Sequence, residues 1–182
     1  DGKHVYATGY EDSSVVVFSR NSSTGAITYI EVQQDGVDGI NGLSTPYAVT
    51  VSPDGKNVYA AGYGDNAVVV FSRDSSTGEL TYVQMQQDGV GGVDGLDGPT
   101  SVEVTPDGNH VYVTGDIDDA VVVFSRNALT GVLTYVEMQK DDVGGVDGLN
   151  GVYSLAVSPD GDHVYTVAYA EDSISVFSRS SS

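Results

Sequence analysis

The sequence predicts an all-β fold, a β-propeller built from four-stranded antiparallel blades, and three observations lead to this prediction. One stretch recurs four times with starts 53 residues apart: VYATGYEDSSVVVFSR (5–20), VYAAGYGDNAVVVFSR (58–73), VYVTGDIDDAVVVFSR (111–126) and VYTVAYAEDSISVFSR (164–179). Each period holds short runs rich in Val, Tyr, Phe and Thr, bounded by Gly, Pro, Asp, Asn or Ser. No helical spacing of apolar residues is present. Four strands in a repeat of this length are typical of a propeller blade.

The second period shows the elements of one blade in order. Strands are predicted at 47–52, 57–62, 67–72 and 80–86. The third strand reads Val-Val-Val-Phe without interruption, which indicates burial on both faces, whereas the fourth alternates with polar residues and is expected at the wet outer edge. Pro53-Asp54-Gly55 predicts a tight turn between the first two strands, because Pro fixes φ and Gly accepts a positive φ.

The 182 residues contain three full periods and 23 further residues, and we expect a single domain. The expected divisions are a partial blade at 1–45, blades at 46–98 and 99–151, and a partial blade at 152–182. One blade cannot cover its two apolar faces, so blades must stack on copies of themselves. With about 3.5 blades per chain, we expect a second copy to close the ring as a homodimer of seven or eight blades. The chain starts in mid-repeat, which indicates a piece of a longer protein.

The net charge limits the classes of molecule that the chain can bind. The net charge is −19, from 26 acidic and 7 basic residues. Nucleic acid is excluded as a partner because its phosphates require clustered Lys and Arg. No apolar run approaches the roughly 20 residues of a membrane span, so membrane insertion is not expected. The chain has no cysteine and therefore no disulfide or thiolate site. We expect an extracellular or periplasmic location.

The stretch SPDGKNVYAAGYGDNAVVVFSRDSSTGEL (52–80) resembles the YVTN-type, lactonase-like propeller repeat. Tyr112-Val113-Thr114-Gly115 is the nearest copy of the tetrad that names the repeat, with Gly where the motif has Asn. The motifs SPDG, VY, VFSR and TG recur together over the whole chain. The resemblance implies the propeller fold. It also implies, as one function, hydrolysis of the 6-phosphogluconolactonase type, although many similar proteins are surface or secreted proteins without an assigned chemistry.

Catalysis on a lactone requires a general base and a cation or donor at the developing oxyanion. The basic side chains form repeat columns: Arg20, Arg73, Arg126 and Arg179 in one, and His4, His110 and His163 in another, with Asn57 as the fourth copy. A catalytic centre would need unlike groups from different blades, so no catalytic or cofactor-binding residue is predicted. The arginines are interpreted as ties to neighbouring carboxylates or carbonyls, the histidines as solvated residues and Glu103 as a channel-lining acid.

Three acidic loops join each fourth strand to the next blade: QQDGVDGINGLS (33–44), QQDGVGGVDGLDG (86–98) and QKDDVGGVDGLNG (139–151). Glycines between short oxygen donors let carboxylates converge on Ca²⁺, although Asp-Gly pairs also form ordinary turns. The candidate calcium ligands are Asp35, Asn41, Asp88, Asp94, Asp97, Asp141, Asp142 and Asp147. A second acidic column is interpreted as a solvated rim, with cation binding as the alternative: Asp12, Asp65, Asp118 and Glu171.

Three functions remain open from the sequence. The first is a non-catalytic repeat scaffold or binding module that presents acidic loops to a cation. The second is a lactonase-like hydrolase. The third is a repeat fragment whose property is folding and self-assembly into a propeller.

Overall fold

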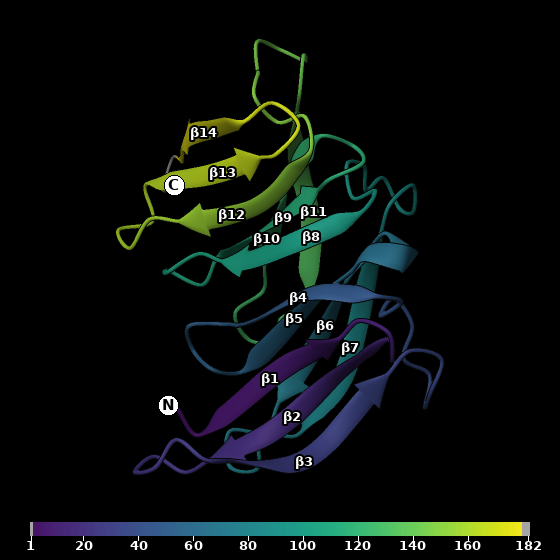
Figure 1. The fold of residues 1–182 in the computed structure, drawn as a ribbon, viewed down its shortest axis with the longest axis vertical. Helices are drawn as coiled ribbons and strands as arrows, with labels where there is room; N and C mark the ends of the chain where they lie inside the picture. Colours follow the sequence, from purple (N-terminus) through teal and green to yellow (C-terminus); the bar gives the residue numbers. More distant parts are fainter. Residues whose placement is uncertain (1, 180–182) are drawn as a thin grey trace.

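The computed structural model describes residues 2–179 as four antiparallel sheets that follow one another along the chain (Figure 1). Sheet 1 contains β1 (His4–Gly9), β2 (Ser14–Arg20) and β3 (Ile27–Gln34). Sheet 2 contains β4 (Pro46–Val51), β5 (Asn57–Gly62), β6 (Ala67–Arg73) and β7 (Leu80–Gln87). Sheet 3 contains β8 (Pro99–Val104), β9 (His110–Gly115), β10 (Ala120–Arg126) and β11 (Leu133–Lys140). Sheet 4 contains β12 (Val152–Val157), β13 (His163–Ala168) and β14 (Ser173–Ser178).

The all-β prediction is confirmed, and in sheet 2 each predicted strand lies within one residue of the observed one. Within every sheet, strands that are consecutive in sequence pair with each other. Strand β6 is buried along almost its whole length, whereas β7 is half-buried, as the sequence indicated. Gly55 has φ of 70° in the predicted turn. The helix η1 (Tyr63–Asp65) was not predicted. In residues 2–179 no helix has the length and apolar character of a membrane span.

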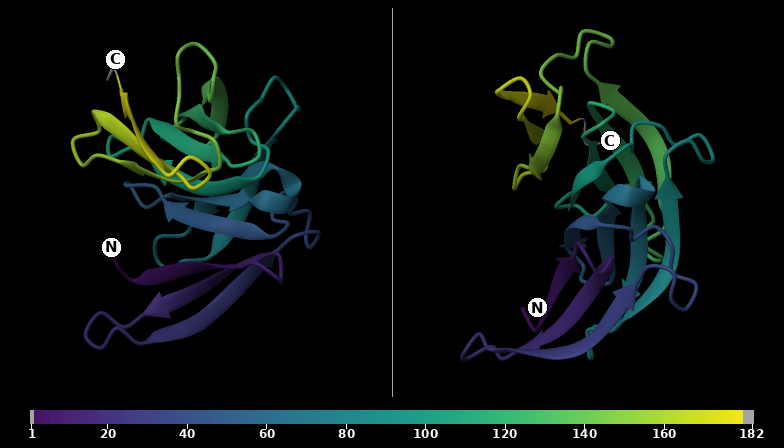
Figure 2. Two further views of the ribbon diagram at one scale, coloured as in Figure 1. Left: turned by 45° about the horizontal axis from the view of Figure 1, so that its top comes forward. Right: turned by 45° about the vertical axis from the view of Figure 1, so that its right-hand side comes forward.

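The sheets stack face to face, and a separate apolar cluster fills each of the three junctions. In sheets 2 and 3, which have a neighbour on each side, the third strand contributes to two of these clusters. Val69 and Phe71 of β6 belong to the cluster shared with sheet 1, whereas Val68 and Val70 belong to the cluster shared with sheet 3. This alternation follows from the period-two geometry of a strand. Strands β4, β8 and β12 lie along the concave inner side, and β7 and β11 lie outside them (Figure 2).

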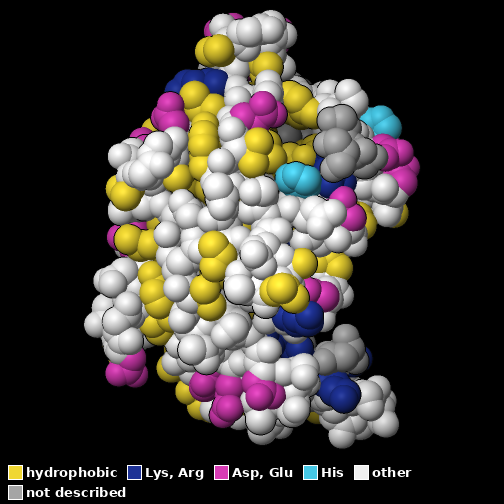
Figure 3. Space-filling model, turned by 180° about the vertical axis from the view of Figure 1, so that it is seen from behind, with side chains coloured by type: hydrophobic (Ala, Val, Ile, Leu, Met, Phe, Trp, Pro, Cys, Tyr) yellow, Lys and Arg dark blue, Asp and Glu magenta, His cyan; other side chains and the backbone are white. Residues whose placement is uncertain are grey.

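The two end sheets leave apolar faces uncovered in the described residues. Ile174 and Val176 of β14 are 72% and 57% exposed, although Val68 and Val70 at the same repeat positions are fully buried. On the face seen in Figure 3, hydrophobic side chains lie exposed between acidic ones. The same side chains are therefore core or surface depending on whether another sheet follows.

Candidate functional site

The arginine column forms clamps between neighbouring sheets. The Arg126 guanidinium at the end of β10 is almost fully buried and reaches back to sheet 2. Its Nε donates to the Tyr59 hydroxyl at 2.7 Å, and one terminal nitrogen donates to the Gly108 carbonyl at 2.9 Å. The other terminal nitrogen donates to both Asp54 oxygens at 3.0 Å and to Asn57 Oδ1 at 2.8 Å. The predicted tie to carboxylate and carbonyl groups is confirmed.

The clamp recurs at both neighbouring junctions. Arg73 donates to the Tyr6 hydroxyl at 2.6 Å and approaches His4 Nδ1 at 2.8 Å. Arg179 donates to Asp107 at 2.6 Å and approaches His110 Nδ1 at 2.9 Å. Burial tends to raise the pKa of the Asp107 carboxyl, but hydrogen bonds from Thr105, a backbone amide and Arg179 outweigh it and hold the pKa well below its usual range.

The interpretation of the histidine column as solvated residues is wrong for His4 and His110, because each is half-buried against an arginine of the next sheet. Arg can only donate, so the Nδ1 atom must accept and the ring must be neutral, with its proton on Nε2. Burial and the nearby Arg73 and Arg179 lower the pKa of these two histidines. Asn57 replaces the histidine at the middle junction and accepts the same bond through its amide oxygen.

Stability is expected to fall as the pH drops below about 6.5, the ordinary pKa of histidine. The pKa of His4 and of His110 is lower in the folded chain than in the unfolded chain, so the unfolded chain takes up protons first. The stabilisation that the two neutral histidines provide is complete above about pH 6.5 and is lost progressively below it. Urea unfolding of the wild type and of His4→Asn/His110→Asn at pH 7 and pH 5 measures it.

Asn57 supplies the control for this pH dependence. The double asparagine variant should lose most of the stability difference between the two pH values, and Asn57→His should increase it. An unchanged pH dependence in the double variant would show that these rings do not set it.

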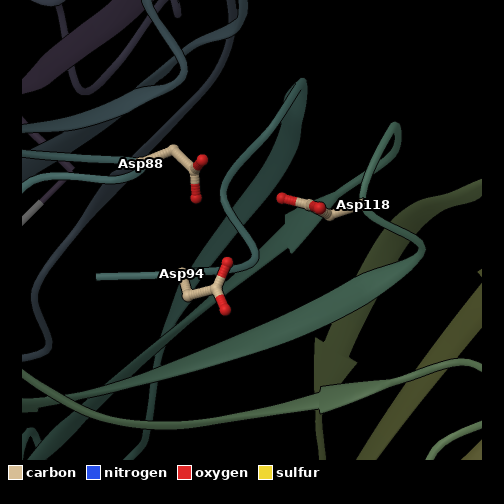
Figure 4. A group of neighbouring side chains, drawn as sticks. All are labelled: Asp88, Asp94 and Asp118. Atoms are coloured by element: carbon tan, nitrogen blue, oxygen red, sulfur yellow. The ribbon is translucent and has the colours of Figure 1, made fainter. Parts of the chain in front are cut away.

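An acidic cluster lies at the junction between sheets 2 and 3. Asp88 and Asp94 in the loop after β7 and Asp118 in the β9–β10 turn point their carboxylates toward one another (Figure 4). One oxygen from each lies within 4.8 Å of the other two. Asp88 Oδ1 also accepts the Leu96 amide at 3.0 Å, and Asp118 Oδ2 accepts the Asp97 amide at 2.9 Å. These bonds fold the loop over the turn and leave the second oxygen of Asp88 for another partner.

The same arrangement recurs at the junction between sheets 3 and 4. Asp141, Asp147 and Glu171 bring one oxygen each within 4.8 Å of the others. Asp141 Oδ1 accepts the Leu149 amide at 2.9 Å. At the first junction the corresponding side chains are Asp35, Asn41 and Asp65, with a neutral amide in the middle position. Here Asp35 accepts the Leu43 amide at 3.0 Å, and Asp65 accepts the Ser44 amide at 2.9 Å.

Not all of the predicted ligands join these clusters. Asp97 contributes its backbone amide to the loop, and Asp142 occupies a left-handed turn position with φ of 57°, where the other two loops have glycine. Neither carboxylate is among the three that converge. Conversely, Asp118 and Glu171 complete the clusters, which favours the alternative of cation binding over a purely solvated rim for these two residues.

Lys140 introduces a difference between the two acidic clusters. Its Nζ lies 3.1 Å from Asp118 Oδ1, and this hydrogen bond raises the pKa of the lysine. A cation at Asp88, Asp94 and Asp118 would compete with this ammonium. Among the described residues, no lysine contacts the carboxylates at the junction between sheets 3 and 4. A cation at that junction would therefore not compete with an ammonium group.

Sequence reasoning missed a row of tyrosines along the concave side. Tyr47 at the start of β4 contacts the rings of Tyr10, Tyr63 and Tyr153 at centroid distances of 5.4, 5.0 and 6.2 Å. Tyr153 in turn contacts Tyr169 at 6.2 Å. The signal was in the sequence, because these tyrosines recur at the repeat spacing.

Sheet 3 interrupts the tyrosine row. Thr100 and Asp116 occupy the positions at which the other periods have tyrosine. The rings of Tyr47 in sheet 2 and Tyr153 in sheet 4 are nevertheless in contact. Burial raises the pKa of the Asp116 carboxyl, and its Oδ1 is buried without a hydrogen-bond partner in the described residues. Glu103 lies on the inner strand β8 opposite Tyr112, and burial raises its pKa as well. Sheet 3 therefore departs from the repeat at three positions, Thr100, Glu103 and Asp116.

Comparison with known proteins gives a consistent result. A family model described as "Lactonase, 7-bladed beta-propeller" matches residues 1–145 and again 94–182. A "putative 6-phosphogluconolactonase" from Bacteroides uniformis has 23% identity and a TM-score of 0.79, over 100% of this chain and 48% of that one. Another from Bacteroides fragilis has 27% identity and a TM-score of 0.66, over 78% and 37%.

A periplasmic gluconolactonase from Pseudomonas aeruginosa has 23% identity and a TM-score of 0.72, over 99% of this chain and 48% of that one. The chain thus spans about half the length, or less, of these three similar structures. No curated protein sequence matches the chain.

Proposed function

We propose that this chain, which belongs to the lactonase family of seven-bladed β-propellers, is part of a non-catalytic scaffold or binding module that binds Ca²⁺ at its acidic loops. The observation that carries the proposal is the recurrence of three converging carboxylates at two successive blade junctions. In each case a loop from one blade supplies two acids, and the turn of the next blade supplies the third. A cation there would tie neighbouring blades together.

The chemistry of the donors suits calcium. Ca²⁺ takes six to eight oxygen ligands, from carboxylates, carbonyls and water. Three carboxylates supply part of this set, and carbonyl groups or water would complete it. The net charge of −19 raises the local concentration of cations around the whole surface. Bound cations would also relieve the repulsion between acids that the fold places within 4.8 Å of one another.

Adding calcium is expected to raise the melting temperature, because a ligand that binds only the folded chain stabilises it. One site at a free concentration of 100 times Kd contributes about 2.7 kcal/mol. Differential scanning calorimetry with and without millimolar CaCl₂ measures the gain, and chelator should reverse it. Asp94→Asn/Asp147→Asn should abolish most of the gain, because it gives both clusters the neutral amide that Asn41 has at the first junction.

Asp38→Asn is the matched control, since this acid lies in the first loop, outside the two clusters, and its substitution should leave the calcium response intact. An unchanged melting temperature at millimolar calcium would show that the acidic loops do not bind Ca²⁺.

The absence of catalysis is proposed because Arg73, Arg126 and Arg179 are engaged in the clamps between blades. The alternative, a lactonase-like hydrolase, is supported by family membership and by the two similar Bacteroides proteins. Glu103 is its best candidate acid, because burial raises its pKa. Hydrolysis of a 6-phosphogluconolactone above the spontaneous rate, lost in Glu103→Gln, would favour this alternative.

Closure of the ring by a second copy remains part of the proposal. The uncovered face of sheet 4, with Ile174 and Val176, corresponds to faces that inside the chain pack on the next sheet. The opposite face of sheet 1 is also partly uncovered, at Tyr29 and Val32. A homodimer of seven or eight blades joins such faces, and light scattering that finds only monomer would exclude it. An extracellular or periplasmic location is proposed with it, consistent with the periplasmic gluconolactonase.

A further inference from the structure

Four rings of the tyrosine row form a connected chain from sheet 2 to sheet 4. The inner strand β8 lies between β4 and β12 (Figure 1), and Thr100 occupies on β8 the position at which the other two strands have tyrosine. Tyr47 of β4 and Tyr153 of β12 contact each other at 6.2 Å. Tyr47 also contacts Tyr63 at 5.0 Å, and Tyr153 contacts Tyr169 at 6.2 Å. The chain of contacts therefore begins and ends in the turns of the two sheets that flank sheet 3.

The two ends of this chain of rings lie near one carboxylate. Asp116 occupies in sheet 3 the repeat position that Tyr63 occupies in sheet 2 and Tyr169 in sheet 4. Burial, followed by the Asp116 carboxylate and the Tyr169 hydroxyl, raises the pKa of Tyr63. The same carboxylate is the largest cause of the raised pKa of Tyr169. Both phenol groups are therefore within electrostatic reach of Asp116, and the four rings and the acid gather at one place.

The glycine-rich loops bring these side chains together. The Asp116 amide donates to the Gly98 carbonyl at 2.9 Å, and the Tyr169 amide donates to the Gly151 carbonyl at 3.1 Å. A Cβ atom on Gly98 would lie 3.0 Å from the Tyr63 ring, and one on Gly151 would lie 3.1 Å from the Tyr169 ring. Each ring therefore lies directly against the loop that leads to the next inner strand.

The charge around the rings is negative. Asp116 Oδ1 is buried and has no hydrogen-bond partner within residues 2–179. A second acid, Asp119, lies close to this carboxylate, and Asp97 is within electrostatic reach of Tyr63. Among the described residues, no lysine or arginine forms a salt bridge with Asp116. A buried carboxylate oxygen without a donor is costly, so this site favours a ligand that supplies both a donor and a positive charge.

We propose that these four tyrosines and Asp116 form a binding site for an alkylammonium group, which is a protonated amine with small alkyl substituents. Its N–H donates to Asp116 Oδ1, and its alkyl groups lie against the tyrosine faces, which attract cations through the ring quadrupole. The planes of Tyr47 and Tyr153 differ by 87° and those of Tyr153 and Tyr169 by 79°, so the faces have different orientations around the bound group. The Tyr169 ring is 65% exposed and can turn aside as the ligand enters.

Two other ligand classes fit this site less well. A hard metal ion requires several oxygen ligands rather than ring faces. A neutral ligand would leave the charges of Asp97, Asp116 and Asp119 uncompensated. The site contains none of the carboxylates that converge in the two acidic clusters, and it does not contain Glu103. The inference therefore depends on neither calcium binding nor hydrolysis.

The probe is trimethylammonium chloride, titrated in the presence of a calcium chelator into the chain labelled with ¹³C in its tyrosine rings. We expect saturable binding of one cation per chain with a Kd of about 1 mM, measured by NMR as shifts of the Tyr153 and Tyr169 ring signals. tert-Butanol has the same shape and a hydroxyl donor but no charge, and tetramethylammonium has the charge but no N–H. Each should bind at least about tenfold more weakly.

Asp116→Asn keeps the shape of the side chain and removes its charge, so it should weaken binding at least about tenfold. The variant should remain folded, because no hydrogen bond to Oδ1 is lost. Asp38→Asn is the matched control, since it removes the same charge from an exposed position in the first acidic loop. It should leave the affinity within about twofold.

A second pair of variants tests the rings. Tyr153→Leu should weaken binding about threefold, the effect of one cation–π contact. Tyr29→Leu should have no effect, because it removes an exposed ring that contacts Phe18 outside the tyrosine row. Absence of saturable binding, equal affinity for tert-butanol or tetramethylammonium, or full affinity in Asp116→Asn would overturn the proposal.

Discussion

Replacement of Phe124 by alanine is expected to lower the free energy of unfolding by about 4 kcal/mol, within the range for large-to-small changes of a buried aromatic residue. Phe124 is fully buried in the cluster between sheets 2 and 3, and its ring meets Tyr135 edge-on at 6.1 Å. The substitution removes apolar contacts and leaves a cavity that two rigid sheets cannot close. Urea unfolding followed by circular dichroism measures the loss, which corresponds to roughly 8 to 16 °C in melting temperature.

Phe18→Ala is the control, because Phe18 occupies the same repeat position and also meets a tyrosine edge-on, Tyr29 at 6.4 Å. It lies on the outer face of sheet 1 and is only partly buried. Its substitution should cost clearly less, about 1 to 2 kcal/mol. Equal losses for the two variants would show that phenylalanine at this repeat position does not stabilise the chain through packing between sheets.

Replacement of Arg126 by alanine is expected to lower the free energy of unfolding by about 3 kcal/mol, at the low end for breaking a buried ion pair. The guanidinium makes bonds to Tyr59, Gly108, Asp54 and Asn57 while being 1% exposed. Without it, these groups lose a donor inside the junction between sheets 2 and 3. The partner Asp54 is 31% exposed and can recover some hydration, which keeps the loss from being larger.

Arg20→Ala is the internal comparison for the arginine column. Arg20 is exposed, and its guanidinium donates to the Gly2 carbonyl at 3.0 Å. Its substitution should change the free energy of unfolding by no more than about 0.5 kcal/mol. Chemical denaturation of both variants at pH 7 measures the difference, and a loss in Arg126→Ala as small as that in Arg20→Ala would contradict the role of the clamp.

The sequence by itself determined the local structure. Short runs rich in Val, Tyr, Phe and Thr, with turn residues at each end, specified the strands of the second period to within one residue, because strand geometry depends on neighbours in sequence. The repeat spacing also indicated the stacking of like units and the tie made by the arginine column. The same spacing marked the acidic loops that supply Asp88, Asp94, Asp141 and Asp147 to the two clusters.

Only the tertiary structure decided which repeat columns meet. Asp118 comes from the turn of the next blade and joins Asp88 and Asp94, whereas Asp97 in the same loop turns its backbone toward the cluster. His110 meets Arg179 of the following blade, 69 residues away, which no spacing within one period reveals. A repeat defines each column, but the distance between columns depends on the twist and offset of one sheet against the next, and these are set by side-chain packing at the junction.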